Sequence, residues 1–218
     1  MGKKRLEDAI KQMNHPIEVV YKCFELDPTS ERDINYSIYE SLSKKYGMSI
    51  DQAKANTNNM VQMAKELGLD YQFDTMILTN TFDAHRLVMF AKKQGLMVEM
   101  TERILHAYFT ESKHIGDHKT LIQLAVEVGL DQESVARMLA SDEMSHEVRA
   151  DEQEAVDYGI RSVPFFLVNK KYAITGAQPT QVFVDSLNQI IEQDGLAEEF
   201  PHDEGEFCDD EGCDIPKK

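Results

Sequence analysis

Two cysteines near the C-terminus are the residues of this chain best suited to redox chemistry. Cys208 and Cys213 stand five positions apart in the segment Phe-Cys-Asp-Asp-Glu-Gly-Cys and form its one closely spaced dithiol pair. The acidic residues 209–211 should raise the pKa of both thiols, because neighbouring negative charge disfavours the thiolate. Such thiols suit a resolving or regulatory role, so we interpret them as a secondary redox pair. Metal capture together with His202 and a chemically inert tail are the alternatives.

The third cysteine, Cys23, lies in the middle of a segment predicted to be a strand, where a buried apolar role is expected. Three cysteines are too few for a disulfide scaffold. The histidines of the folded body lack the spacing typical of metal ligands, so no metal site is predicted there.

A short apolar run with a proline near its beginning, residues 162–168, is the second stretch of chemical interest. Proline cannot donate a hydrogen bond to a sheet, so Pro164 is expected among the first residues of a strand or at a sheet edge. A polar turn connects this run to a second strand-like run, residues 172–175. The two runs are therefore predicted to form a β-hairpin.

The composition is that of an acidic globular protein. The chain has 218 residues, of which 42% are hydrophobic, a formal net charge of -16 and a pI near 4.8. Nucleic acids and anionic membranes are attracted by clustered Lys and Arg side chains, so neither partner is expected. No apolar run is long enough to span a membrane, and the first residues lack the apolar region of a secretory signal. A cytoplasmic location is expected.

The hydrophobic pattern predicts one long helical stretch between two regions that contain strands. Residues 3–13 have apolar side chains at helical spacing, and residues 17–26 are rich in β-branched and aromatic residues, as is typical of a strand. From residue 30 to about residue 158 the pattern is helical, with glycine after each segment. The order of elements predicts a small mixed sheet covered by the first and last helices, with a helical insertion.

Particular residues are expected to open these helices. Side chains that cap helices are predicted at Ser49, Thr81, Asp117 and Asp131. Pro179 is expected as the first residue of a last helix that ends near Gly195.

Five stretches that span nearly the whole chain, in the right order, resemble a known family. They are residues 2–7 (Gly-Lys-Lys-Arg-Leu-Glu), 24–28 (Phe-Glu-Leu-Asp-Pro), 80–86 (Asn-Thr-Phe-Asp-Ala-His-Arg), 159–168, and 176–179 (Gly-Ala-Gln-Pro). In these stretches the chain resembles the DsbA family, specifically its FrnE-like branch near the kappa glutathione transferases and 2-hydroxychromene-2-carboxylate isomerases. The resemblance implies an α/β thioredoxin-like fold, here without its first strand, with a large all-helical insertion.

The resemblance also implies a division of the chain into four parts. Residues 1–29 would form the first part of the thioredoxin-like domain, residues 30–158 the helical insertion, residues 159–200 the second part of the thioredoxin-like domain, and residues 201–218 an acidic flexible tail with Cys-x4-Cys.

The family places a Cys-Pro-x-Cys motif at the start of its first helix, directly before the position of Met1. The chain as written therefore has no catalytic nucleophile, and we expect the motif and its strand to lie upstream of Met1. A domain without its central strand would bury unpaired backbone groups, each costing about 1–3 kcal/mol. The alternative is a shortened protein that repairs the gap by strand exchange or by pairing in a homo-oligomer.

The resemblance assigns substrate-binding roles to three residues. Pro164 would be a cis-proline facing the active cysteines, and Val163 would present backbone groups to a bound peptide or to glutathione. His85 would lie near the site, where an imidazole stabilises a thiolate or carries a proton. The alternative for His85 is a helix histidine bonded within a domain interface. The resemblance also supports a redox role for Cys208 and Cys213, because some FrnE-like proteins carry a similar pair.

The activity implied by the resemblance is that of a thiol-disulfide oxidoreductase or isomerase acting on protein or peptide disulfides, without a cofactor, and inactive in the written form if the nucleophile is absent. A glutathione-dependent isomerase or transferase of the kappa type, with glutathione as co-substrate, is one alternative. A non-catalytic client- or metal-binding module is the other.

The helical stretch is rich in methionine, and core packing is the expected role. A groove for unfolded polypeptide is the alternative, since methionine adapts to varied surfaces. The residues are Met60, Met63, Met89, Met97, Met100 and Met138.

Overall fold

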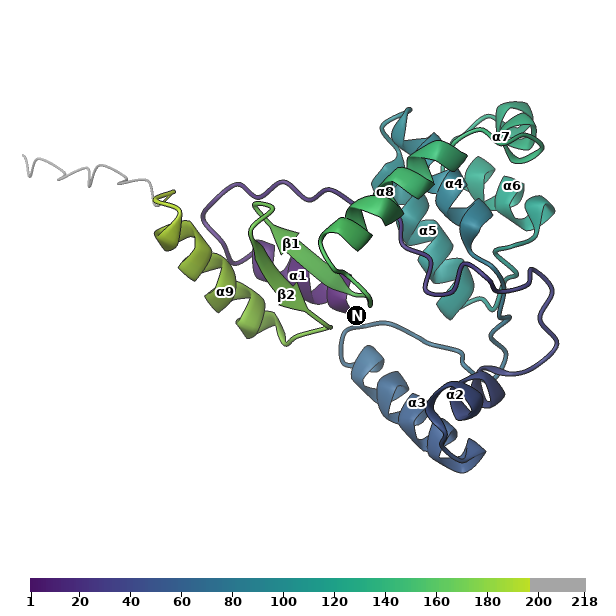
Figure 1. The fold of residues 1–218 in the computed structure, drawn as a ribbon, viewed down its shortest axis with the longest axis horizontal. Coiled ribbons are helices and arrows are strands. Elements are labelled where there is room, and N and C mark those ends of the chain that lie inside the picture. Colours follow the sequence, from purple (N-terminus) through teal and green to yellow (C-terminus); the bar gives the residue numbers. More distant parts are fainter. Residues whose placement is uncertain (197–218) are drawn as a thin grey trace, which may run out of the picture.

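The computed structural model describes residues 1–196, which form two groups of elements on either side of the N-terminus (Figure 1). The first group consists of α1 (Gly2–Ile10), β1 (Phe165–Val168), β2 (Tyr172–Thr175) and α9 (Thr180–Gln193). The second group consists of α2 (Ile38–Tyr46), α3 (Ile50–Lys65), α4 (Phe82–Lys92), α5 (Met97–Phe109), α6 (His118–Glu127), α7 (Gln132–Leu139) and α8 (Ser145–Asp157). No helix within residues 1–196 is long and apolar enough to cross a membrane.

The first group is a small α/β unit with its own core. β1 and β2 pair antiparallel, with Phe166 opposite Ile174, so the predicted hairpin is confirmed. Ala9 of α1 and Phe183 of α9 are fully buried against this hairpin. The rings of Phe166 and Phe183 meet edge to face at 4.8 Å, a geometry that aromatic pairs prefer. The hairpin, the first helix and the last helix therefore depend on one another for burial.

Within the second group, α5 to α8 pack around α4. This helix contacts α5, α6, α7 and α8, and its cluster buries Leu87, Leu121, Leu124 and Val148. α2 and α3 pair with each other and bury a second, smaller cluster that includes Tyr39. The predicted helical stretch thus forms two cores, separate from the core of the hairpin.

Side-chain caps open several of these helices where the sequence predicts them. Ser49 and Gln52 form a reciprocal capping box at the start of α3. Asp117 and Asp131 accept the N–H groups of the first turns of α6 and α7. These bonds satisfy donors that a helix start otherwise leaves free.

Two helix starts differ in detail from the prediction, although α4 begins at Phe82 as predicted. At α4 the side chain of Thr81 makes no capping bond, and Asn80 Oδ1 instead accepts the N–H of Phe82 at 2.8 Å. α9 begins at Thr180, because Pro179 has an extended ψ of 149° and occupies the N-cap position. The difference at α4 concerns the capping bond alone, whereas the start of α9 shifts by one residue. The order of elements is unchanged.

The prediction of a strand at residues 17–26 is wrong. This segment is extended, but it makes no backbone hydrogen bond to another strand within the described residues. The sheet there has two antiparallel strands and is not mixed. Side chains of α8 hold the segment instead: Asp151 accepts the Cys23 N–H at 2.8 Å and a bond from Lys22 Nζ at 2.9 Å. A strand needs a neighbour to pair with, and composition alone does not reveal one.

The methionines divide between core and surface. Met89, Met100 and Met138 are buried in the cluster around α4, as core packing predicts. Met60 and Met63 lie exposed on α3. A polypeptide-binding methionine surface therefore stays a prediction for α3.

Asp194 fastens the turn of the hairpin to the end of α9. Its carboxylate accepts hydrogen bonds from Asn169 Nδ2 at 2.8 Å, from the Tyr172 hydroxyl at 2.7 Å and from Lys171 Nζ at 3.0 Å. These donors, Asn169 foremost, lower the pKa of Asp194 to about 2. The ionised carboxylate is the form that holds the turn.

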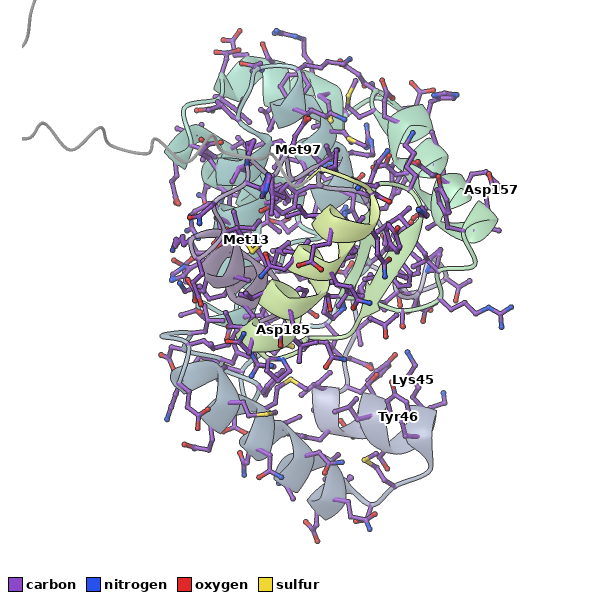
Figure 2. All side chains as sticks on the ribbon, turned by 90° about the vertical axis from the view of Figure 1, so that its left-hand side faces the viewer. Met13, Lys45, Tyr46, Met97, Asp157 and Asp185 are labelled. Atoms are coloured by element: carbon purple, nitrogen blue, oxygen red, sulfur yellow. The ribbon has the colours of Figure 1, made fainter. Side chains whose placement is uncertain are left out.

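We expect Asp194→Asn to lower the midpoint of thermal unfolding at pH 7 and to have no effect near pH 2. A depressed pKa in the folded state stabilises fully above the unfolded value of 3.8, and this contribution is lost as the pH falls towards 2. Circular dichroism between pH 2 and 7 measures the difference. Asp185→Asn is the control, because Asp185 lies exposed on α9 (Figure 2) and accepts one bond, from Gln181. A difference that is the same at every pH would contradict this role.

Candidate functional site

Val163 and Pro164 form a corner of the chain between α8 and β1. The peptide bond between them is cis, as predicted. The side chain of Val163 is 44% exposed, and Pro164 is half-buried. The carbonyl of Pro164 accepts the N–H of Gly176 at 2.8 Å, which ties this corner to the end of β2. Val163 is thus presented to solvent by a loop whose position is fixed.

The first turn of α1 packs directly against this corner, and the N-terminus lies beside the loop that enters β1 (Figure 1). A Cβ on Gly2 would lie 2.8 Å from Pro164 Cγ and 3.3 Å from Phe166 Cζ, so only glycine allows this approach. Arg5 Nη1 donates to the carbonyl of Ala177 at 2.5 Å and fixes α1 to the loop after β2. A helix start has free N–H groups and the positive end of the helix dipole. We call the set Gly2, Val163 and Pro164 the helix–proline site.

Polar contacts join the same turn of α1 to the helical insertion. Lys3 forms an ion pair with Glu102 of α5. The ammonium group of Met1 donates to the Tyr71 hydroxyl at 3.0 Å. Burial acts to lower the pKa of Lys3, but the carboxylates of Glu102 and Glu7 act more strongly in the opposite direction. The pKa of Lys3 is therefore raised. Burial also lowers the pKa of the Met1 amino group. The site therefore lies where the α/β unit meets the insertion.

His85 lies on α4, at the contact between the insertion and the extended segment before it. Burial lowers the pKa of its imidazole, which favours the neutral form. A hydrogen bond with the backbone of Phe24 and the charges of Glu152 and Asp151 act in the opposite direction. No hydrogen bond or ion pair joins His85 to Val163 or Pro164 among residues 1–196. The structure thus places His85 in a domain contact, and a role in substrate binding stays a prediction.

The cysteines differ in accessibility. Cys23 is 2% exposed, as expected for an apolar filler, and burial, reinforced by Asp151, raises the pKa of its thiol to about 12. It is therefore unsuited to nucleophilic attack. Cys208 and Cys213 lie outside the described residues.

Three buried charged residues, Glu25, Arg86 and Asp151, are not identified as site residues by the sequence patterns. Arg86 donates to three backbone carbonyls in the segment 138–143 and to the carboxylate of Asp83. Asp151 holds the extended segment, as described above. Arg86 stands in a stretch that carries the family resemblance, which was an available signal, whereas Asp151 lies in a highly charged helix without one. Within residues 1–196, no group of three or more His, Cys, Asp or Glu side chains could hold a metal ion.

Solved structures of similar fold include disulfide-exchange proteins. A structure titled "probable DsbA oxidoreductase SCO1869" from Streptomyces coelicolor superposes with a TM-score of 0.84 and is 35% identical, covering 99% of this chain and 93% of that one. The cytosolic disulfide reductase DsbM from Pseudomonas aeruginosa has the same fold, with a TM-score of 0.55, 16% identity, and coverage of 88% and 92% of the two chains.

Sequence comparison agrees with the fold. YwbO, an uncharacterized protein of Bacillus subtilis, is 28% identical over 192 residues, which cover 86% of this chain and 88% of that protein. The sequence profile of the DSBA-like thioredoxin domain matches residues 1–188. The α/β unit, its helical insertion and the proline corner beside the first helix are thus features of a known fold, and the chain belongs to the DSBA-like thioredoxin domain family.

Proposed function

We propose that this chain acts in thiol-disulfide exchange on protein disulfides, as an oxidoreductase or isomerase of the DsbA type. The observation that carries the proposal is the helix–proline site, where the start of α1 touches Pro164 beside the exposed Val163. A thiol at a helix N-terminus has a lowered pKa, because the N–H groups and the dipole favour the thiolate. A polypeptide held along Val163 would therefore lie next to a position suited to a reactive thiol.

Cys208 and Cys213 are the cysteine pair of this chain that we propose for the chemistry. A thiolate attacks one sulfur of the substrate disulfide, and the other sulfur leaves and takes up a proton. The second cysteine then displaces the substrate from the mixed disulfide, so the cysteine pair is oxidised as the substrate is reduced.

Reduction of insulin by dithiothreitol tests the proposal in the 218-residue protein. We expect the protein to accelerate precipitation of the insulin B chain above the rate with dithiothreitol alone. The Cys208→Ser/Cys213→Ser double variant should lose the acceleration. The acceleration should increase from pH 7 to pH 8.5, because the acidic neighbours of these thiols raise their pKa values. Absence of any acceleration would overturn catalysis by this chain.

Substrate binding at the helix–proline site predicts a specific effect of Val163→Asp. The substitution places a charge where an apolar segment of an unfolded polypeptide would pack, so the dissociation constant should rise roughly five- to tenfold. Fluorescence anisotropy with labelled, reduced and carboxymethylated α-lactalbumin measures it. Val182→Asp is the matched control, because Val182 is similarly exposed on α9. Equal effects of the two substitutions would count against binding at Val163.

A glutathione-dependent isomerase or transferase is the second candidate. Its support is the fold shared with DsbM, which has also been solved with GSH. Glutathione would bind as a co-substrate along the backbone of Val163. Isothermal titration with glutathione decides: no heat, together with no competition against the polypeptide probe, removes this candidate.

A third candidate function, the cellular compartment and the oligomeric state are also proposals. A non-catalytic client-binding module would bind the polypeptide probe without accelerating insulin reduction. The cytoplasm is the proposed compartment, supported by the cytosolic name of DsbM, which has the same fold. Nucleic acids and membranes are not proposed as partners, and a homo-oligomer would be recognised by light scattering.

A further inference from the structure

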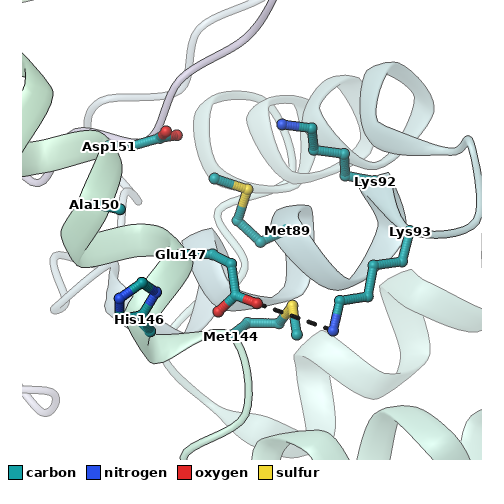
Figure 3. Close-up of a pocket in the computed structure, with 8 residues that line it drawn as sticks. All are labelled: Met89, Lys92, Lys93, Met144, His146, Glu147, Ala150 and Asp151. Carbon is teal, nitrogen blue, oxygen red and sulfur yellow. Dashed lines mark ion pairs between the residues drawn. The ribbon is translucent and has the colours of Figure 1, made fainter.

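A concave surface that shares no residue with the helix–proline site lies between the last turns of α4 and the first half of α8 (Figure 3). It is widely open to solvent, and its volume is about 570 Å³. Small-molecule sites commonly have volumes of about 300–1,000 Å³. The residues that matter for its chemistry are Met89, Lys92, Lys93, Met144, Glu147 and Asp151.

Two methionines supply the apolar part of this surface. Met89 and Met144 are almost completely buried, and Figure 3 shows Met89 between the lysines of α4 and the side chains of α8. A thioether side chain is unbranched and polarizable, so it adapts to the shape of an aliphatic or aromatic group. Ala150, whose small side chain lies on the α8 wall, leaves room for such a group.

The charged side chains around the methionines differ in whether they have an ion-pair partner. Asp151 is bound to Lys22 at 2.9 Å, and Glu147 faces Lys93 at 4.0 Å. Lys92, by contrast, forms no ion pair within residues 1–196. The surface therefore combines an apolar floor with one ammonium group that has no carboxylate partner there. This combination is complementary to a ligand with one negative charge and an apolar body.

We propose that this cavity, called the methionine–lysine cavity, binds an amphipathic organic monoanion such as an aliphatic or aryl carboxylate. The apolar body lies on Met89 and Met144, and the anionic group is bound by Lys92. The proposal is independent of the helix–proline site, and its failure would leave the proposed function unchanged.

Fluorescence of 8-anilinonaphthalene-1-sulfonate, an apolar monoanion, tests whether the cavity is the binding site. We expect saturable binding that is lost in Ala150→Trp, because the indole fills the cavity. Ala55→Trp is the matched control, since Ala55 is also exposed and also lies within a helix, α3. Absence of saturable binding, or equal binding by the two variants, would overturn the proposal.

A second pair of variants tests the anionic contact. Lys92→Glu should raise the dissociation constant of the same probe by roughly two- to fivefold, as expected for the loss of a partly exposed ion pair. Lys65→Glu, in the last turn of α3 as Lys92 is in the last turn of α4, should leave binding unchanged. Octanoate should displace the probe at concentrations where octanol does not. Equal displacement by the two compounds, or equal effects of the two lysine variants, would overturn recognition of the anion.

Discussion

Replacing Arg86 with leucine is expected to lower the free energy of unfolding by about 3–5 kcal/mol. Arg86 is 4% exposed, and its guanidinium is surrounded by acceptors. It donates to the carbonyls of Met138 at 2.7 Å, Ser141 at 2.5 Å and Glu143 at 2.9 Å. It also bonds the carboxylate of Asp83 at 2.7 Å. Leucine fills a similar space but removes the donor to the carbonyls of Ser141 and Glu143, and a buried acceptor without a partner is costly. The carbonyl of Met138 keeps its bonds from Ser141, and the carboxylate of Asp83 keeps its bond to His118.

Guanidinium chloride unfolding followed by circular dichroism measures this loss. The matched control is Arg137→Leu, because Arg137 is a largely exposed arginine of α7 with one ion pair, to Glu133 at 3.7 Å. Exposed pairs contribute about 0–1 kcal/mol, so the control should be almost neutral. Similar unfolding midpoints for the two variants would show that the bonds of Arg86 are replaced by water.

The second large effect is expected at Asp151, which fastens the extended segment to α8. Asp151→Ala leaves the buried N–H of Cys23 unpaired and removes one of the two carboxylate partners of Lys22, the other being Glu154. We expect a loss of about 2–3 kcal/mol. Because Cys23 lies beneath this contact, its thiol should become accessible at the same time.

The rate at which dithiobis(nitrobenzoate) labels Cys23 measures how accessible its thiol is. The measurement uses a Cys208→Ser/Cys213→Ser background, so that only Cys23 reacts. The unsubstituted parent of that background should label slowly under native conditions, and Asp151→Ala should label roughly 30- to 100-fold faster. Asp157→Ala is the control, since Asp157 is exposed at the end of the same helix (Figure 2) and accepts a bond from Gln153. Unchanged labelling in Asp151→Ala would show that the segment is held by apolar packing rather than by this carboxylate.

Local patterns explain what the sequence predicts well. The hairpin follows from two short apolar runs around a polar turn, and the caps at Ser49, Asp117 and Asp131 follow from side chains that reach a neighbouring N–H. Each of these features depends on residues a few positions apart. The family resemblance, which also predicts the cis bond before Pro164, depends on short stretches of the same kind.

Contacts between distant residues explain what the sequence does not predict. Residues 17–26 have the composition of a strand, but whether such a segment pairs depends on what lies beside it. Here Asp151 of α8 binds Lys22 and the N–H of Cys23. The approach of Gly2 to Pro164 joins residues separated by most of the chain. The bonds of Arg86 depend on where the segment between α7 and α8 passes. The types and spacing of neighbouring residues do not determine such contacts.

For the polypeptide binding proposed at Val163, the contact between Gly2 and Pro164 limits the sides from which a substrate could approach. The proline ring is covered by the first turn of α1 on one side, and the chain bonds to Gly176 through the carbonyl of Pro164. The open flank is the one that carries Val163. The proposed access is therefore one-sided: a polypeptide would meet the loop along the edge that carries Val163, where its two chain directions are not equivalent. An arrangement of this kind would discriminate between the two orientations of a bound peptide.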